Sequence, residues 1–319
     1  MKILITGGAG FIGSSLADAL LLKGKEIIVL DNFNNYYDPA LKENNVRHNL
    51  QNPKYRLYRG DICDKQILEK VFDENKIDAV IHIAANAGVR ASIENSEIFV
   101  QTNISGTLNV LEQMKKKEIK KLVFASSSSV YGNCKADKFS EDLKVSEPIS
   151  PYAMTKSACE QLIYTYSFLY AIKSICLRFF TVYGPRQRPD LAIRKFAELI
   201  EEGKEIPVFG DGSSKRDYTY IDDIINGISA AIDYDKSSYE IINLGGGSPI
   251  TLNEMIAVIE KAVGKKALRK NLPMQKGDVE RTVCDISKAK TLLKFEPKTS
   301  FKEGVEEFLL WRKKQNNGI

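Results

Sequence analysis

The sequence predicts an α/β fold: a doubly wound parallel sheet with a smaller C-terminal α/β lobe. Two observations support this fold class. Apolar runs of strand length alternate with stretches of helical periodicity through the first half of the chain, a pattern typical of parallel sheets covered by helices on both faces. A glycine-rich turn, from Gly7 to Gly13, joins the first apolar run to the first helical stretch, which is where doubly wound folds carry a phosphate-binding turn.

The expected elements follow in chain order. Strands are expected at 3–5, 27–30, 55–58, 79–83, 122–125 and 174–177, and shorter ones at 206–209 and 241–244. Helices are expected at 16–22, 66–72, 98–114, 157–170, 192–202, 222–232, 252–263 and 302–311, with a long loop and one helix in 33–53. Because the alternation loosens after residue 180, we expect a Rossmann-like dinucleotide-binding domain at 1–180. A smaller lobe at 181–319, interleaved with it, would close a cleft.

The composition limits the possible functions. The chain has 319 residues, 43% of them hydrophobic, and a net charge of +5 from 46 basic and 41 acidic residues. Its lysine runs fall near expected helix ends, so this mild excess gives no reason to expect nucleic-acid binding. Five scattered cysteines without a C-x-x-C pair predict neither a disulfide framework nor a metal site, and they favour a reducing cytoplasm. The chain begins with Met-Lys directly before a predicted strand and has no apolar run near about 18 residues, so we expect neither a signal peptide nor a membrane span.

The glycine turn predicts a dinucleotide site. Gly7, Gly10 and Gly13 fit the pattern G-x-x-G-x-x-G, and Gly8 with the last two fits G-x-G-x-x-G. Such glycines allow a tight turn, a close approach of backbone to a pyrophosphate, and close packing of helix on strand, while the helix start offers N–H groups to phosphate. Asp31, 24 residues after Gly7, ends the second apolar run and can accept hydrogen bonds from an adenosine ribose. A plain strand–turn–helix without a ligand stays open as the alternative.

Two further motifs indicate chemistry. Tyr152 and Lys156 stand four residues apart, which puts both side chains on one face of a helix. Tyrosine is a poor base at its usual pKa of about 10, and a neighbouring ammonium lowers that pKa by stabilising the phenolate. The run Ser126 to Ser129, which we call the serine loop, lies shortly before this pair, at the carboxyl end of an expected strand, where open α/β sheets bind ligands. Taken singly, a surface pair and an ordinary serine loop remain the alternatives.

In this order and spacing, the three motifs resemble the extended short-chain dehydrogenase/reductase superfamily over essentially the whole chain. The resemblance implies NAD-dependent chemistry on a nucleotide sugar, with Ser127, Tyr152 and Lys156 as the catalytic triad. NAD rather than NADP is expected because Asp31 would repel a 2′-phosphate and Asn32 follows it where a cation would be needed. The resemblance assigns the dinucleotide to Gly7, Gly10, Phe11, Ile12, Gly13, Asp31, Asn32, Asp61, Ile62, Ala84, Ala85, Asn103, Tyr152 and Lys156. It also implies a homodimer in which two helices of each subunit, within 92–114 and 152–170, form a four-helix bundle.

The second half resembles the part of these enzymes that binds a nucleoside-diphosphate sugar. The segment from Phe209 to Tyr218 matches one in which an arginine, here Arg216, meets the diphosphate. Arginine suits phosphate because its planar fork donates hydrogen bonds in pairs. Gln275 and Asp278 fall in a second such segment, where some relatives have arginine in place of Gln275 and where Asp278 would hold the uridine ribose.

The residues in the serine loop limit the reaction. Dehydratases and decarboxylases of this superfamily resemble the chain but carry acidic residues in the loop, whereas this chain has Ser128 and Ser129. Without an acid–base residue an elimination lacks its catalyst. Reversible oxidation at the sugar C4, an epimerisation, is the reaction that remains.

Two stretches indicate that the sugar is acidic. Segments 31–39 and 181–190 closely resemble the UDP-glucuronate 4-epimerases of the superfamily. Charge-assisted hydrogen bonds would hold the sugar carboxylate, and the residues expected to provide them are Ser127, Ser128, Ser129, Thr181 and Arg188. Arg90 is expected to line the cleft. We therefore expect conversion of UDP-glucuronate to UDP-galacturonate through a transient 4-keto sugar. A UDP-glucose or UDP-N-acetylglucosamine 4-epimerase is the nearest alternative, and a catalytically silent NAD-binding protein is an alternative of another class.

Overall fold

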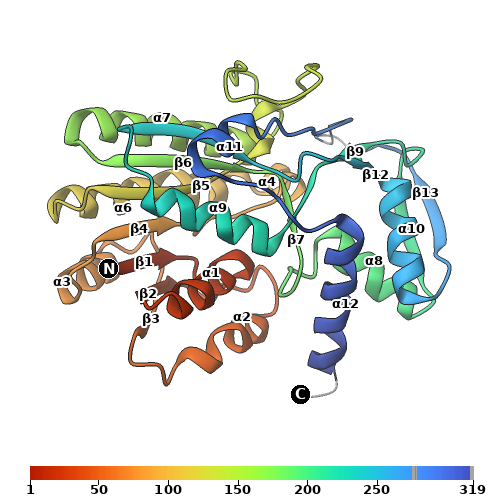
Figure 1. Ribbon diagram of the computed structural model, residues 1–319, viewed down its shortest axis with the longest axis horizontal. Coiled ribbons are helices and arrows are strands. Elements are labelled where there is room, and N and C mark those ends of the chain that lie inside the picture. The colour runs from red at the N-terminus through yellow and green to blue at the C-terminus, as the bar shows by residue number, and fades with distance from the viewer. Residues whose placement is uncertain (275–276, 278, 317–319) are drawn as a thin grey trace.

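Seven parallel strands form the main sheet of the protein, which a computed structural model describes over residues 1–274, 277 and 279–316 (Figure 1). Their order is β11-β6-β5-β4-β1-β2-β3. Their bounds are β1 Lys2–Thr6, β2 Glu26–Asp31, β3 Tyr55–Arg59, β4 Ala79–His82, β5 Lys121–Ser127, β6 Lys173–Phe179 and β11 Tyr239–Leu244. The order of strands reverses between β1 and β4, so the carboxyl ends of these two strands mark the expected ligand site.

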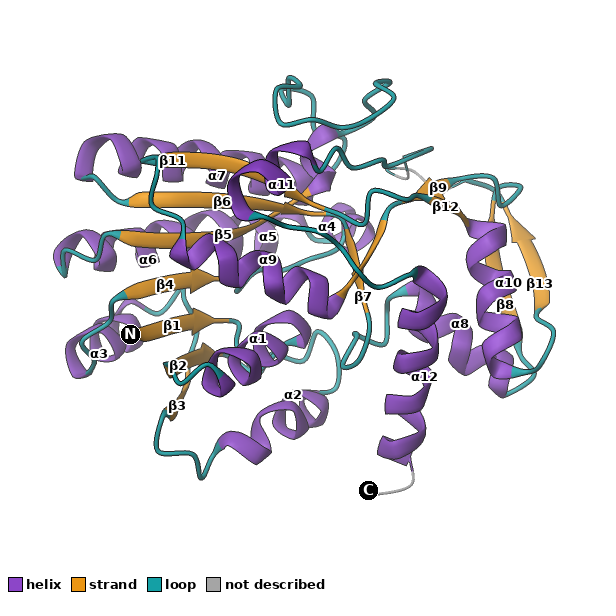
Figure 2. Ribbon diagram, viewed as in Figure 1, coloured by secondary structure: helices purple, strands orange, loops and turns teal. Residues whose placement is uncertain are grey.

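Helices cover both faces of this sheet (Figure 2). Successive side chains of a strand point to opposite faces, so Ile3 and Ile5 of β1 enter one core and Leu4 enters the other. The first core includes α1 (Phe11–Leu22) and α9 (Ile221–Asp233). The second includes α3 (Lys65–Glu74), α6 (Gly106–Lys116) and α7 (Pro151–Tyr170).

The second half of the chain builds a smaller lobe and also contributes to the main sheet. Its short strands pair as β7 (Thr181–Tyr183) with β10 (Tyr218–Tyr220), β8 (Glu205–Phe209) with β13 (Leu268–Leu272), and β9 (Lys215–Arg216) with β12 (Ile250–Thr251). Helices α8 (Ala192–Glu201), α10 (Leu252–Val263) and α12 (Phe301–Asn316) gather beside these strands, at the right of Figure 1. Strand β11, helix α9 and helix α11 (Ser287–Leu293) return to the main sheet.

The remaining elements are short. They are α2 (Pro39–Val46), α4 (Val89–Glu94), α5 (Ser96–Phe99), the 3-10 helices Arg47–Asn49 and Ser128–Tyr131, and a π-helical turn, Val100–Ser105. Among the described residues, no helix combines the length and the apolar character needed to cross a membrane.

The predicted fold class is confirmed, and the expected strands and helices are present, most of them with shifted ends and one helix divided. One expectation was wrong: 98–114 is not a single regular helix, because the π-helical turn separates α5 from α6. The carbonyl of Asn103, inside that turn, accepts from Thr107 Oγ1 at 2.5 Å and from Cys159 Sγ at 3.1 Å. Side chains that bond to a helix carbonyl compete with the regular backbone ladder. The two- and three-residue strands of the smaller lobe were missed because a strand of that length is too short to show an alternating apolar pattern.

Candidate active site

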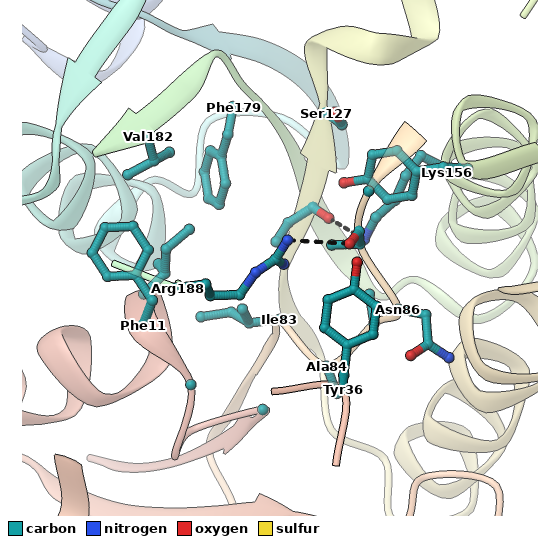
Figure 3. A pocket seen from close by; sticks show the side chains of 18 of the residues that line it. Phe11, Tyr36, Ile83, Ala84, Asn86, Ser127, Lys156, Phe179, Val182 and Arg188 are labelled. Atoms are coloured by element: carbon teal, nitrogen blue, oxygen red, sulfur yellow. Dashed lines mark hydrogen bonds between the residues drawn. The ribbon is translucent and has the colours of Figure 1, made fainter. Parts of the chain in front are cut away.

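A cavity of about 500 Å³ lies at the carboxyl ends of the main-sheet strands (Figure 3). Loops after β1, β2, β3, β4, β5 and β6 line it, and Leu191, Arg216, Val279 and Thr282 close it from the second half of the chain. Most residues predicted for the site meet here: Gly7, Gly10, Phe11, Ile12, Gly13, Asp31, Asn32, Asp61, Ile62, Ala84, Ala85, Ser127, Ser128, Ser129, Tyr152, Lys156, Thr181, Arg188 and Arg216. Among the described residues, Arg90 and Asn103 stand outside the lining. Gln275 and Asp278 lie outside the described residues.

The glycine turn has the shape that a pyrophosphate requires. A Cβ at Gly13 would stand 2.2 Å from the carbonyl oxygen of Gly7, so α1 packs against the turn only because Gly13 has no side chain. A Cβ at Gly10 would keep 3.4 Å from the same oxygen, and Gly10 lines the cavity. Helix α1 begins without a side-chain cap, which leaves its first N–H groups available to an anion.

Asp31, at the end of β2, is buried beside this turn. Its carboxylate accepts from the Ala9 N–H at 3.0 Å and from the Phe33 N–H at 2.9 Å. The Lys42 Nζ lies 3.9 Å from the same carboxylate and donates to Asn34 Oδ1 at 2.8 Å. Burial lowers the pKa of Lys42, and the charge of Asp31 acts against this shift. The end of the cavity where the sequence predicts the dinucleotide therefore holds a paired cation, Lys42, that was not predicted.

Helix α7 brings Tyr152 to the cavity. The helix begins where the Ser150 side chain caps it, so Tyr152 stands in the first turn, where it hydrogen-bonds with Ser127. Burial raises the pKa of Tyr152 above its usual value, while the bond with Ser127 and the charge of Arg188 act to lower it. The sequence predicts Lys156 as the stabilising cation, whereas the cation that lowers the pKa of Tyr152 in the structure is Arg188.

Lys156 lies one turn further along α7 and is 3% exposed. Its Nζ donates to the carbonyl of Ala125 at 2.7 Å and lies 4.7 Å from the centre of the Phe124 ring. Burial lowers the pKa of Lys156 to about 8, with Cys159 and Glu160 acting to raise it. The ammonium therefore keeps its charge at neutral pH while it is held within the protein.

Arg188 enters the cavity from the loop after β7. Its Nε and Nη2 donate to the carboxylate of Asp190 at 2.9 and 2.7 Å, and Nη2 also donates to the Ala87 carbonyl at 3.3 Å. The guanidinium lies 5.2 Å from the centre of the Tyr36 ring, and Figure 3 shows both side chains pointing toward the same part of the cavity. The residues expected to hold the sugar carboxylate thus all line one cavity, together with Tyr152.

The two other predicted arginines have different places. Arg216, in β9, lines the cavity, and its Nη1 donates to the Lys215 carbonyl at 2.9 Å. Arg90, in α4, lies with its guanidinium 4.6 Å from the centre of the Phe209 ring in β8. Arg90 therefore joins the segment after β4 to the smaller lobe.

Asn103 acts behind the lining. Its side chain accepts from the Asn86 N–H at 2.8 Å, donates to the Asn86 carbonyl at 3.0 Å, and donates to Thr155 Oγ1 at 3.0 Å. Asn86 itself lines the cavity. Asn103 therefore ties the wall of the cavity to α7.

Sequence reasoning missed several lining residues. Tyr36, Tyr37 and Lys42 line the cavity, although none was assigned a role from the sequence. Two of them fall in segment 31–39, which resembles the UDP-glucuronate 4-epimerases. A pair of tyrosines in an otherwise polar loop was the available signal.

Comparisons with known proteins agree with this arrangement. A family model described as GDP-mannose 4,6 dehydratase matches residues 4–308. A UDP-glucuronate 4-epimerase of Thermodesulfobacterium geofontis (strain OPF15) is 48% identical over 311 residues, which cover 97% of this chain and 95% of the relative. Crystal structures of UDP-glucuronic acid 4-epimerase from Bacillus cereus, in complex with UDP-glucuronic acid and NAD, and of UDP-glucose 4-epimerase from Thermotoga maritima, with UDP-glucose, also match. The first has a TM-score of 0.92 and 39% identity, covering 99% of this chain and 100% of the other. The second has a TM-score of 0.90 and 33% identity, with the same coverage.

The match to the family model spans most of the chain, and the motifs that suggested the resemblance line one cavity. The chain belongs to the extended short-chain dehydrogenase/reductase family, within the group that the GDP-mannose 4,6 dehydratase model describes.

Proposed function

We propose that this protein is an NAD-dependent UDP-sugar 4-epimerase that converts UDP-glucuronate to UDP-galacturonate. The observation that carries the proposal is the position of Arg188, which lines the cavity together with Tyr152. Ser127, Thr181 and their neighbours add hydroxyl donors to the same lining. The relatives named above, with bound UDP-glucuronic acid and NAD in one case, support this choice of sugar.

The residues around the glycine turn fit NAD. The open start of α1 would hold the pyrophosphate and Asp31 the adenosine ribose, and the lining beside them is Phe11, Ile12, Asn32, Asp61, Ile62, Ala84 and Ala85. When bound, NAD would supply the acceptor for a hydride from the sugar C4 and the donor for its return. Tyr152 and Lys156 would face the nicotinamide end, and Asn103 would support that end through Asn86.

The protein's own side chains would handle the proton. Tyr152, as phenolate, would take the proton from the sugar O4, with Ser127 hydrogen-bonded to it as a relay. The charge of Arg188 favours the phenolate, and Lys156, one turn further along α7, would add to this effect. The 4-keto sugar would then turn about its diphosphate linkage and present its other face, while Arg216 and the predicted Gln275 and Asp278 hold the nucleotide.

The residues expected to hold the sugar carboxylate would also protect the intermediate. A 4-keto-glucuronate is a β-keto acid and loses CO₂ readily. Ser127, Ser128, Ser129, Thr181 and Arg188 would hold the carboxylate in an orientation unsuited to cleavage of the C–C bond. Ser128 and Ser129 also leave the loop without the acid that an elimination requires, which favours an epimerase over a dehydratase despite the description of the matching family model.

Three finer proposals accompany the function. The chain would form a homodimer through a four-helix bundle, in the cytoplasm, with domains at 1–180 and 181–319 that are interleaved through β11 and α9. Exposed apolar side chains within the two expected helical segments support the dimer, and we call this set the bundle face: Ile98, Val100, Leu108, Tyr164, Phe168 and Leu169. Five unpaired cysteines support a reducing compartment.

Product analysis tests the proposal. The purified protein is incubated separately with UDP-glucuronate, UDP-glucose and UDP-N-acetylglucosamine, and the epimers are resolved by chromatography. We expect UDP-galacturonate from the first and at most slow conversion of the others. Conversion of UDP-glucose alone would move the assignment to the alternative substrate, and no conversion of any sugar would reject the epimerase.

A further inference from the structure

A buried carboxylate lies just behind the proposed catalytic residues. Glu160 follows Tyr152 by two turns and Lys156 by one turn on the same helix, α7. The Glu160 side chain is 4% exposed and that of its partner Arg178, in β6, is 2% exposed. Neither residue lines the cavity among the described residues.

The carboxylate of Glu160 joins three elements. Its Oε1 accepts from Ser126 Oγ at 2.5 Å and from Arg178 Nε at 2.9 Å, and its Oε2 accepts from Arg178 Nη2 at 2.7 Å. Ser126 directly precedes Ser127 at the end of β5, and Arg178 lies near the end of β6, just before the segment that leads to Thr181. The hydrogen bonds therefore set the spacing between three elements that each carry site residues.

Arg178 extends this contact to the serine loop. Its guanidinium lies 4.8 Å from the centre of the Tyr131 ring, and Tyr131 ends the 3-10 helix that contains Ser128 and Ser129. The Tyr131 hydroxyl donates to Asn243 Oδ1 at 2.7 Å, on β11. The Glu160–Arg178 ion pair thus contacts the serine loop through Tyr131, on the side away from the cavity lining.

Stability alone does not explain such a pair. Removing two charges from water costs several kcal/mol per ion, so a buried ion pair often contributes no more than well-packed apolar residues would. What the pair does provide is a fixed geometry, because a bidentate arginine–carboxylate contact tolerates little change in distance or angle.

We infer that Glu160 is a positioning residue of the active site, whose carboxylate fixes the serine loop against the Tyr152–Lys156 face of α7 and supplies the negative charge behind Lys156. This inference rests on the proposed function, since it takes Ser127, Tyr152 and Lys156 as the reacting groups.

The charge of Glu160 acts on Lys156 within a crowded environment. Lys156 has Cys159 and Glu160 on its own helix and Cys176 on β6, all of which act to raise its pKa against burial. The Phe124 ring and the Ala125 carbonyl face it from β5, and His82 faces it from β4. Of these groups, Glu160 is the carboxylate, and Arg178, which pairs with it, carries the opposite charge. Glu160→Gln removes the negative charge and leaves that of Arg178, so the deprotonation of Lys156 will shift to lower pH.

Two substitutions of Glu160 distinguish the effect of its side-chain length from the effect of its charge. Glu160→Gln keeps the length and the hydrogen-bonding oxygen but removes the charge. Glu160→Asp keeps the charge but is one methylene shorter and cannot reach Ser126 and Arg178 together. Asp223→Asn is the matched control, because Asp223 is also a buried carboxylate, accepts from the Lys298 and Thr299 N–H groups at 3.0 and 3.2 Å, and lies away from the cavity. For each variant we measure the melting temperature, the bound NAD, and kcat and KM for UDP-glucuronate from pH 6 to 10.

We expect Glu160→Asp to lose about tenfold to hundredfold in kcat with little change in KM, because small displacements of reacting groups cost this much. Because Lys156 must be charged to act, kcat should fall at alkaline pH as Lys156 loses its proton. We expect this fall to begin at lower pH in Glu160→Gln and at the wild-type pH in Glu160→Asp and Asp223→Asn. If Glu160→Gln does not fold, Ser126→Ala, which removes only the hydroxyl from the cluster, should still lower kcat. Wild-type kcat and an unmoved pH profile in the folded Glu160 variants would overturn the inference while leaving the epimerase intact. Absence of turnover in the wild type would instead reject the proposed function.

Discussion

Gly10 and Gly13 belong to one turn, but the space around them differs. A Cβ at Gly13 would meet the carbonyl oxygen of Gly7 at 2.2 Å, a backbone contact that cannot move without shifting the turn. A Cβ at Gly10 has 3.4 Å to the same oxygen and 3.9 Å to the Tyr37 hydroxyl. Gly10 also has a φ of −73°, which any residue adopts. The absence of a side chain at Gly10 therefore leaves space for the proposed ligand, and its absence at Gly13 lets the protein's own backbone pack closely.

This difference predicts opposite effects of the same substitution. Gly10→Ala should keep the melting temperature but purify with little NAD, because its methyl group enters the space for the pyrophosphate. Gly13→Ala should lower the free energy of unfolding by about 2 kcal/mol or more, as expected when the backbone must shift. Thermal melts and the NAD content of the purified variants check both results. Equal loss of stability in the two variants would contradict this account of the turn.

Tyr152 offers the clearest test of the proposed base. Tyr152→Phe removes the hydroxyl that hydrogen-bonds with Ser127, so kcat should fall by about 10²- to 10⁴-fold, the usual contribution of a general base. NAD should stay bound, because the ring remains. Tyr164→Phe, on the same helix but 54% exposed, is the matched control and should keep the wild-type rate. Wild-type activity in Tyr152→Phe would refute the proposed role.

At the scale of elements, the regular parts of the fold were predictable, whereas the directions of individual loop side chains were not. The run Ile27 to Leu30 is buried on both faces, so its apolar character marks a central strand whatever surrounds it. Loop residues have no such period. Arg186 and Arg188 are two positions apart and look alike in the sequence, yet Arg186 donates to Asp18 of α1 at 2.7 Å while Arg188 lines the cavity. A positive φ of 66° at Arg186 separates their directions, and only the folded backbone supplies that information.

Helix α7 has an inward face and an exposed face, and the exposed face predicts contact with a second copy of the chain. Tyr152, Lys156 and Glu160 face inward, whereas Phe168, 78% exposed, and Leu169, 57% exposed, belong to the bundle face. Large apolar side chains left exposed on one segment commonly mark a contact with another chain. Phe168→Asp should therefore convert the proposed dimer to a monomer of 35.8 kDa, as measured by light scattering.

Leu22→Asp is the control for this experiment. Leu22 ends α1 and is 90% exposed, but it stands on the opposite side of the sheet from α7. A charge at Leu22 should leave the mass unchanged. A wild-type monomer at micromolar concentration, or a Phe168→Asp variant that remains dimeric, would contradict the proposed bundle.

At the scale of the whole molecule, one buried histidine connects the centre of the sheet to the helices behind it. His82 ends β4, where Thr6 Oγ1 lies 2.6 Å from its Nδ1 and Thr107 Oγ1 lies 2.9 Å from its Nε2. Thr107 uses its only hydroxyl proton on the carbonyl of Asn103, so it must accept from His82. The proton of His82 therefore sits on Nε2, and Nδ1 accepts from Thr6. This chain of bonds runs from β1 through β4 to α6 and the turn that carries Asn103.

The chain of bonds makes the fold sensitive to acid. Burial lowers the pKa of His82 from 6.5 to about 3, with the charge of Lys156 acting in the same direction. As the pH falls below 6.5 the unfolded chain takes up this proton first, so stability is lost progressively down to about pH 3. The loss should be about 2 kcal/mol between pH 7 and pH 5, at 1.36 kcal/mol per unit.

Denaturant unfolding at several pH values measures this dependence of stability on pH. His82→Gln should flatten it even if the variant is less stable overall, whereas His48→Gln, at a half-exposed histidine beside Asp18, should leave it in place. An unchanged slope in His82→Gln would show that other groups set the acid sensitivity of the fold.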